Sequence, residues 1–412
     1  MSMDPACRFC GAPLNQTLVD LGMSPLCESY IDAAALNRME PFYPLHVYVC
    51  GDCLLAQLEE FVSPEEIFTE YAYFSSYADS WLRHAEDYTD MAVGRFGLGA
   101  GSLVVELASN DGYLLQYFVG KGIPALGIEP AQNVAQAAVE RGVPTLVEFF
   151  GERLAGRLAA EGRQADLVVG NNVLAQVPGL NDFVRGIKIL LKPGGVATLE
   201  FPHLVRLMEE NQFDTIYHEH FSYFSFLAVE KVFAAHGLTL FDVEELPTHG
   251  GSLRIYARHA EDAAKPVGDR VGGLRARELA AGLGRMETYA AFSDRVVEAK
   301  RKILEFLIAA RGEGKRICGY GAPGKGNTLL NYCGIRTDFL DYTVDRNPYK
   351  QGKYTPGTHI PIFPPEKIRE TRPDYVFILP WNFKDEIIEQ LGYIRGWGGR
   401  FVVPIPEVRV YP

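Results

Sequence analysis

Short apolar runs alternate with amphipathic stretches through the middle of the chain. Runs of this kind, bounded by turn residues, are typical of buried strands, and the stretches between them repeat apolar residues at helical spacing. The expected strands lie at residues 103–107, 125–130, 145–147, 165–170 and 196–201, and the expected helices at 110–121, 134–141, 153–160 and from 181 onward. Consecutive parallel strands need a crossover helix, so this order predicts an α/β domain with a doubly wound sheet.

A second, smaller alternation lies near the C-terminus. The first expected strand ends just before Gly319. Three more are expected at residues 339–344, 374–382 and 399–404. This order predicts a second Rossmann-like sheet. Between the two regions, residues 275–310 carry Leu, Ala and Val at helical spacing, which predicts one amphipathic packing helix.

The N-terminal region carries two CxxC pairs. Each pair can present two thiolates to one tetrahedral ion, and a segment of about 60 residues needs such a staple. We therefore predict a structural Zn²⁺ held by Cys7, Cys10, Cys50 and Cys53. Free or redox cysteines are the alternative interpretation. Four thiolates leave no open position, which argues against a catalytic metal.

Composition and charge narrow the class of protein. The chain has 412 residues, 22% of them charged, and a net charge of −12. An acidic chain is not typical of nucleic-acid binding, which relies on Lys and Arg against phosphates. No apolar run approaches the roughly 18 residues of a membrane span, and the N-terminus lacks a signal-peptide pattern. We expect a cytoplasmic protein without nucleic-acid or membrane partners.

The turn after the first expected strand is the first candidate site. It runs from Glu106 to Gly112, and a second acid, Glu129, ends the next strand about 20 residues later. Small residues let a ligand approach the backbone, and an acid at the second position commonly accepts hydrogen bonds from ribose hydroxyls. The pattern predicts a crevice for a nucleoside-containing ligand.

A run of His, Glu and Tyr at 216–224 is the second candidate site. A His-Glu-His triplet lacks the helical HExxH spacing of a zinc site, so a metal is disfavoured here, whereas a structural polar cluster stays an alternative. The functional interpretation is a general base, His220, oriented by Glu219. In the aromatic run 70–81, one tyrosine is predicted to donate to an oxyanion, the alternative being a packing segment.

The glycine-rich run 319–326 fits two other motifs in part. Gly319, Gly321 and Gly324 satisfy GxGxxG, with Asp345 at dinucleotide spacing, but Gly326 replaces the Ser or Thr of a P-loop. Both motifs share a backbone cradle, and Lys325 beside it predicts a diphosphate contact.

Taken together, "EYAYFSSYADSW", "VELASNDGYLL", "NNVLAQV", "EFPH", "YHEHFSYF", "GYGAPGKGNTLLN" and the paired CxxC resemble the S-adenosylmethionine-dependent sugar C-methyltransferases of deoxysugar biosynthesis, over nearly the whole chain. The resemblance implies three domains: a zinc-binding domain at 1–68, a class I methyltransferase domain at 69–262 and a Rossmann-like nucleotide-sugar domain at 263–412. It also implies that the GxGxxG run is not an NAD site.

The resemblance assigns roles to residues of the motifs. A base near His220 is expected to remove the C-3 proton of a dTDP-linked 4-keto-sugar, and Tyr71 or Tyr217 to stabilise the enolate, with Glu219 beside the base. The residues expected at the methyl-donor site are Glu106, Ala108, Ser109, Asn110, Gly112, Tyr113, Leu114, Glu129, Pro130, Asn172, Val173 and Ala175. The residues expected to bind the substrate are Gln176, Phe201, Pro202, Tyr223, Tyr320, Gly321, Lys325 and Asn327.

One position departs from the family pattern. Gln176 stands where many members carry histidine, so an acid–base role is lost there while a hydrogen-bonding role survives. An NAD-dependent oxidoreductase and a non-enzymatic nucleotide-sugar binding module are the rival hypotheses. The sequence leaves open which sugar is methylated and the oligomeric state, with a monomer as the working expectation.

Overall fold

The computed structural model describes residues 5–68, 74–77 and 79–412. The chain divides into two compact units, and each is described by itself. The first unit comprises Met1–Asn15, Cys50–His203 and Glu219–Gly284; the second comprises Gln16–Val49, Leu204–His218 and Arg285–Pro412. Among the helices of the described residues, none is long and apolar enough to cross a membrane.

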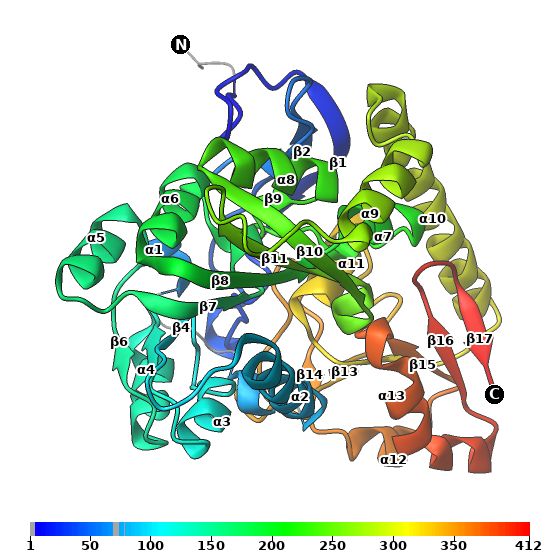
Figure 1. Ribbon diagram of the computed structural model, residues 1–412. Helices are drawn as coiled ribbons and strands as arrows, with labels where there is room; N and C mark the ends of the chain where they lie inside the picture. Colours follow the sequence, from blue (N-terminus) through cyan, green and yellow to red (C-terminus); the bar gives the residue numbers. More distant parts are fainter. Residues whose placement is uncertain (1–4, 69–73, 78) are drawn as a thin grey trace. The chain divides into compact units, whose positions relative to one another are not determined.

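The first unit is built on a seven-stranded sheet in the order β10-β11-β8-β7-β4-β5-β6 (Figure 1). Neighbours from β8 to β6 are parallel, while β11 runs antiparallel to both β8 and β10. Its strands are β4 (Val104–Leu107), β5 (Ala125–Ile128), β6 (Thr145–Leu146), β7 (Ala165–Asn171), β8 (Leu191–Pro202), β10 (Leu238–Leu246) and β11 (Ser252–His259). The strand order reverses between β4 and β7, so the ligand crevice is expected at their carboxyl ends.

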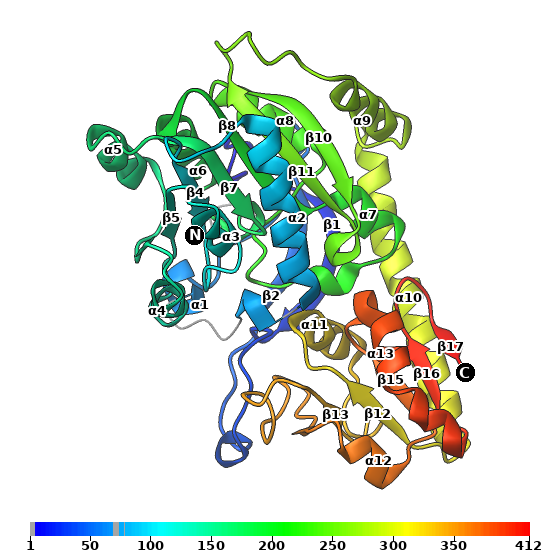
Figure 2. The ribbon, with the colours of Figure 1, turned by 60° about the horizontal axis from the view of Figure 1, so that its bottom comes forward.

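The helices of this unit cover the sheet with apolar stripes. Helix α2 (Asp79–Phe96) lies along one face of the sheet (Figure 2). Its residues Trp81, Ala85, Tyr88 and Ala92 are buried at helical spacing, and the Tyr88 hydroxyl lies 2.5 Å from Thr198 Oγ1 of β8. The other helices are α1 (Pro64–Phe68), α3 (Leu115–Gly120), α4 (Gln132–Glu140), α5 (Glu152–Ala160), α6 (Leu180–Leu190), α8 (Phe226–Ala235) and α9 (Asp269–Ala280). The buried core between α2, α3 and the sheet therefore fixes the strand ends that carry the first candidate site.

The second unit holds the C-terminal sheet, in the order β14-β13-β12-β15-β16-β17. All neighbours are parallel except β17, which pairs antiparallel with β16. Its elements are β12 (Ile317–Tyr320), α11 (Gly324–Cys333), β13 (Thr343–Val344), β14 (Ile362–Phe363), α12 (Lys367–Thr371), β15 (Tyr375–Ile378), α13 (Lys384–Gln390), β16 (Arg400–Val403) and β17 (Arg409–Tyr411). The strand order reverses between β12 and β15. This unit also contains the antiparallel pair β1 (Gln16–Ser24) and β2 (Tyr43–Val49), and the helices α7 (Leu204–Glu209) and α10 (Met286–Gly312).

Three sequence predictions about elements are corrected. The helix expected from residue 110 begins at Leu115, because Asn110 and Gly112 adopt left-handed backbone angles. The single helix expected at 275–310 is two helices, α9 and α10, since residues 281–285 break the pattern and Gly282 has φ of +88°. Of the strand expected at 339–344, only Thr343–Val344 pairs with β12.

Candidate active site and zinc centre

The four predicted zinc ligands come together in the first unit. The sulfur atoms of Cys7, Cys10, Cys50 and Cys53 all lie within 4.8 Å of one another. The Cys7–Cys53 and Cys10–Cys50 sulfur pairs are 3.5 and 3.4 Å apart. A tetrahedral zinc–thiolate site places sulfurs about 3.8 Å apart, given Zn–S bonds of about 2.3 Å. The donor set therefore fits a structural Zn²⁺.

The two knuckles share a local conformation. The residue after each second cysteine is left-handed: Gly11 has φ of +76° and Leu54 has φ of +68°. Gln57 braces the site, because its amide nitrogen lies 3.2 Å from Cys7 Sγ while its oxygen accepts from the Arg8 N–H at 2.9 Å. A side-chain donor to a thiolate orients it and disperses its charge.

The turn after β4 keeps the shape of a glycine-rich loop although glycines are missing. Ala108 and Asn110 have φ of +55° and +49°, and Gly112 has φ of +76°. A left-handed alanine costs on the order of 1 kcal/mol. At Gly112 a Cβ would lie 3.0 Å from Val143 Cγ2, so only glycine suits both the backbone and the space. Strain at such a turn is typical of a ligand-binding site.

Two acids flank this turn, and they differ in how they are satisfied. Glu129 accepts the N–H groups of Asn110 and Ala131, each at 2.9 Å. Glu106 is fully buried, and the neighbouring Tyr113 hydroxyl is the one donor among the described residues that favours its ionised form. Burial raises the pKa of both carboxyl groups, that of Glu106 well above its usual range. A ligand that brings N–H or O–H donors, as S-adenosylmethionine does, would satisfy Glu106.

Other predicted donor-site residues lie at the carboxyl ends of the strands. The residues buried beside the turn are Ser109, Tyr113, Leu114, Val173 and Ala175, while Pro130 and Asn172 are partly exposed. Asn171 Nδ2 contacts the Tyr113 hydroxyl at 3.4 Å, and Asn172 has φ of +54° with its N–H donating to Glu200 O at 2.7 Å. The predicted donor residues from β4, β5 and β7 are thus at one edge of one sheet.

The segment after the aromatic run binds this turn directly. The Ser75 N–H donates to Asn110 Oδ1 at 2.9 Å, and the Ser76 hydroxyl donates to Asp111 Oδ2 at 2.5 Å. Arg141 pairs with the same Asp111 oxygen at 2.9 Å. Tyr71, the predicted oxyanion donor, lies outside the described residues.

Sequence reasoning missed a buried charge network beside this edge. Glu200 of β8 has no exposed surface and accepts bonds from Arg254 of β11 at 2.8 Å and from Thr248 at 2.8 Å. The ring of His84, from α2, lies 2.9 Å from the same carboxylate and stacks on Trp81. Burial opposes ionisation of Glu200, but the bonds from His84 and Arg254 outweigh it and lower its pKa to about 2. Residues this far apart in sequence gave no local signal.

The two histidines of the 216–224 run are in different surroundings. His218 is buried, its Nε2 lies 3.2 Å from Pro44 O, and burial lowers its pKa. His220 is partly exposed, and its ring meets that of Tyr223 edge-on at 6.3 Å. Glu219 is 9% exposed, and Tyr217 is partly exposed. His218 is thus buried, whereas His220 is partly exposed, and the role of His220 as a base stays a prediction.

The predicted substrate residues of the first unit also lie near strand ends. Phe201 is fully buried, Pro202 ends β8, and Gln176 ends a short 3₁₀ turn, Leu174–Gln176. Tyr223 belongs to β9 (Ser222–Tyr223), which pairs antiparallel with β3 (Ala56–Leu58). Their roles toward a substrate stay predictions.

In the second unit, side chains of the same unit pack closely against the glycines of the run 319–326. A Cβ at Gly321 would lie 2.6 Å from Pro380 Cδ, and one at Gly324 would lie 2.9 Å from Cys27 Sγ. Asn327 is buried and donates to Cys27 O at 2.6 Å. These glycines allow close packing within the unit. The close packing explains these glycines without a bound dinucleotide.

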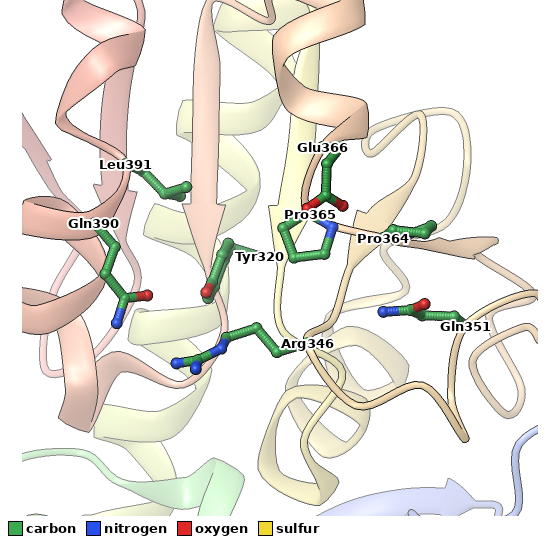
Figure 3. A pocket seen from close by; sticks show the side chains of 8 residues that line it. All are labelled: Tyr320, Arg346, Gln351, Pro364, Pro365, Glu366, Gln390 and Leu391. Atoms are coloured by element: carbon green, nitrogen blue, oxygen red, sulfur yellow. The ribbon is translucent and has the colours of Figure 1, made fainter. Parts of the chain in front are cut away.

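A cavity of about 400 Å³ lies beside this sheet (Figure 3). The Tyr320 side chain, at the end of β12, lies at its centre, between Gln390 and Leu391 on one side and Pro365 and Glu366 on the other. Its remaining lining residues are Arg346, Gln351 and Pro364. Tyr320 is thus the one predicted substrate residue that lines this cavity.

The strand order, the turn and the two strand-end acids define a class I S-adenosylmethionine-dependent methyltransferase. The chain matches three families in sequence order: "Putative zinc binding domain" over residues 7–68, "Methyltransferase domain" over 81–243 and "C-methyltransferase C-terminal domain" over 247–406. The C-methyltransferase NovU of Streptomyces niveus is 38% identical over 404 residues, which cover 98% of this chain and 96% of that relative.

Solved structures align with part of the chain. Magnesium protoporphyrin IX methyltransferase (ChlM) of Synechocystis PCC 6803 with bound SAM is 14% identical, with a TM-score of 0.33, over 43% of this chain and 78% of that one. The CcbJ methyltransferase of Streptomyces caelestis is 13% identical, with a TM-score of 0.33, over 43% of this chain and 89% of that one.

The chain belongs to the family of S-adenosylmethionine-dependent sugar C-methyltransferases. It is an enzyme that takes its methyl group from S-adenosylmethionine and carries a structural zinc.

Proposed function

We propose that the enzyme methylates C-3 of a dTDP-linked 4-keto-deoxysugar, in the biosynthesis of a deoxysugar for an antibiotic. The observation that carries the proposal is the accessible imidazole of His220 in the motif Tyr217–Tyr223, in a chain whose C-methyltransferase relative aligns over 98% of its length. A carbon-bound proton beside a ketone is acidic enough for an imidazole to remove.

The reaction follows from the chemistry of the substrate. S-adenosylmethionine supplies an electrophilic methyl group on sulfonium sulfur. His220 takes the C-3 proton, and the electron pair of that C–H bond moves into the C-4 carbonyl to give an enolate. Tyr71 or Tyr217 donates to the enolate oxygen. The enolate carbon then forms a bond to the methyl carbon, while the electrons of the methyl–sulfur bond stay on sulfur. Alignment of the two reactants supplies a large share of the rate.

The remaining assignments complete the proposal. The donor is held by the Ala108–Gly112 turn with Glu106 and Glu129, and the substrate diphosphate contacts Lys325. Gln176 acts as a hydrogen-bonding residue, because an amide does not titrate. The division into domains at 1–68, 69–262 and 263–412, a cytoplasmic location and a monomeric state belong to the same proposal.

Mass spectrometry of products tests this function. A panel of dTDP-linked keto-sugars is incubated with S-adenosylmethionine, and the expected result is a gain of one methyl on a 4-keto-sugar. A substrate deuterated at C-3 is expected to lose that deuterium as it gains the methyl group. A gain of methyl on oxygen or nitrogen, or turnover of keto-sugars with NAD alone, would contradict it. Stabilisation against heat by S-adenosylmethionine, with none by NAD, is the accompanying binding result.

A further inference from the structure

Three side chains form a clamp in the second unit, here called the Lys325 clamp: Lys325, Trp381 and Asp214. The indole N–H of Trp381 donates to Asp214 Oδ2 at 2.7 Å. Lys325 Nζ lies 4.6 Å from the centre of the Trp381 ring and donates to Asn382 Oδ1 at 2.9 Å. The indole therefore holds the ammonium with its ring face while its edge is tied to the carboxylate.

The clamp lies where this sheet is expected to bind a ligand. Lys325 follows β12 at the start of α11, and Trp381 follows β15 in a 3₁₀ turn, Trp381–Phe383. These two strands are parallel neighbours, and the strand order reverses between them. Ligands of open α/β sheets bind at the carboxyl ends of strands at such a point.

Asp214 has no exposed surface. Its Oδ1 atom has no hydrogen-bond partner among the described residues. Burial raises the pKa of Asp214 to about 6, and the neighbouring Lys325 charge opposes that rise. Burial also lowers the pKa of Lys325, and Asp214 opposes that fall. Each group thus favours the charged form of the other, as neighbouring opposite charges do.

We propose that Asp214 and Trp381 are positioning residues that hold the Lys325 ammonium toward the diphosphate of the nucleotide-sugar. Lysine has three N–H donors, and one of them is used by Asn382. A flexible four-carbon side chain loses affinity if it is not fixed before the ligand arrives. The inference rests on the proposed function, because that function supplies the diphosphate.

The direction in which Asp214→Asn changes the affinity for a diphosphate distinguishes a positioning role from simple charge repulsion. If Asp214 were only an anion near the phosphate site, Asp214→Asn would remove a repulsion and strengthen diphosphate binding. If Asp214 positions Lys325, the same change weakens binding. Asparagine still accepts the Trp381 N–H, so the fold is kept.

Calorimetric titration of the full-length, zinc-loaded protein with thymidine 5′-diphosphate tests the clamp. Lys325→Met, Asp214→Asn and Trp381→Phe are each expected to weaken binding about tenfold, the effect of one charge-assisted hydrogen bond. On the Lys325→Met background, Asp214→Asn is expected to add less than twofold, since the two residues act as one unit. Lys315→Met, at the amino end of β12, is the matched control, because the Lys315 ammonium lies in a partly exposed ion pair with Asp374 at 4.0 Å.

Kinetics supply the second readout. Each clamp variant is expected to raise KM for the nucleotide-sugar while kcat and KM for S-adenosylmethionine change less than twofold. Tighter or unchanged thymidine diphosphate binding by Asp214→Asn, in protein that melts at the parental temperature, would overturn the inference. Full additivity in the double variant would also overturn it. If the parent binds thymidine diphosphate through the clamp but methylates no keto-sugar, the proposed function fails while the clamp stands.

Discussion

The backbone N–H of Leu58 donates to the carbonyl of Phe221 at 3.0 Å, and this bond connects the zinc knuckle to the residue after His220. Leu58 ends β3, which begins three residues after the ligand Cys53, and β3 pairs with β9 at Ala56–Tyr223 and Gln57–Ser222. Arg8, beside the ligand Cys7, stacks its guanidinium over the Phe221 ring at 5.4 Å. The zinc site thus fixes the strand that follows the proposed base.

Removal of zinc is therefore predicted to loosen the β3–β9 pair before the main sheet. A structural zinc contributes its binding free energy to folding, and β3 is the strand that directly follows its ligand Cys53. Hydrogen exchange after chelation is expected to show lost protection at residues 56–58 and 221–223, with β4 and β7 still protected. Cys53→Ser gives the same pattern without a chelator. Unchanged protection at Leu58 would show that the metal does not support this pair.

Gly112→Ala is predicted to destabilise the protein by about 1–3 kcal/mol, because the new Cβ meets Val143 and the backbone is left-handed. The same change should weaken S-adenosylmethionine binding, since the turn must move. Gly142→Ala is the control: its φ is +83° but nothing lies within 4 Å of the new Cβ. Equal losses of affinity in the two variants would contradict a packing role for Gly112.

Glu106→Gln is predicted to stabilise the ligand-free protein at pH 8 by on the order of 1 kcal/mol and to weaken S-adenosylmethionine binding. The folded protein holds the Glu106 proton more tightly than the unfolded chain, because burial raises its pKa well above the usual 4.5. Stability from this group is therefore present at low pH and is lost as pH rises above about 4.5. Denaturant unfolding at several pH values measures the free energy of unfolding of both proteins. A parent whose free energy of unfolding rises relative to that of Glu106→Gln as pH increases would contradict the prediction.

Arg254→Met is predicted to destabilise the protein by about 3–5 kcal/mol, because it removes the guanidinium that pairs with the fully buried Glu200 carboxylate. Glu200 has a pKa lowered to about 2, so its stabilising contribution is present above about 4.5 and is lost as pH falls toward 2. Arg277→Met, whose guanidinium pairs with Glu245 on the surface, should cost less than about 1 kcal/mol. Urea unfolding compares the two.

The sequence predicted the features that depend on local pattern. Three predictions were confirmed: the alternation of strands and helices, the zinc ligands Cys7, Cys10, Cys50 and Cys53, and the S-adenosylmethionine-dependent methyltransferase fold. Periodicity and CxxC spacing are short-range signals that can be read from the sequence. The helix start at Leu115 was missed, since the turn before it includes a left-handed Ala108, a conformation that alanine seldom adopts. The pairing of Glu200 with His84 and Arg254, and of Asp214 with Trp381, depends on tertiary contacts between distant segments. Such pairs leave no pattern in the sequence.

The base assigned to His220 is the centre of the account, and exchange of the substrate C-3 proton tests it most directly. S-adenosylhomocysteine has no methyl group to transfer, so the enolate formed in its presence can only be reprotonated. With S-adenosylhomocysteine and a dTDP-linked 4-keto-deoxysugar in D₂O, the enzyme is expected to incorporate deuterium at C-3, detected by NMR. His220→Asn should abolish incorporation while it still binds the nucleotide-sugar, and His46→Asn, whose ring bonds Thr17 on an exposed strand, should exchange like the parent. Deuterium incorporation by folded His220→Asn at the parental rate would contradict the account.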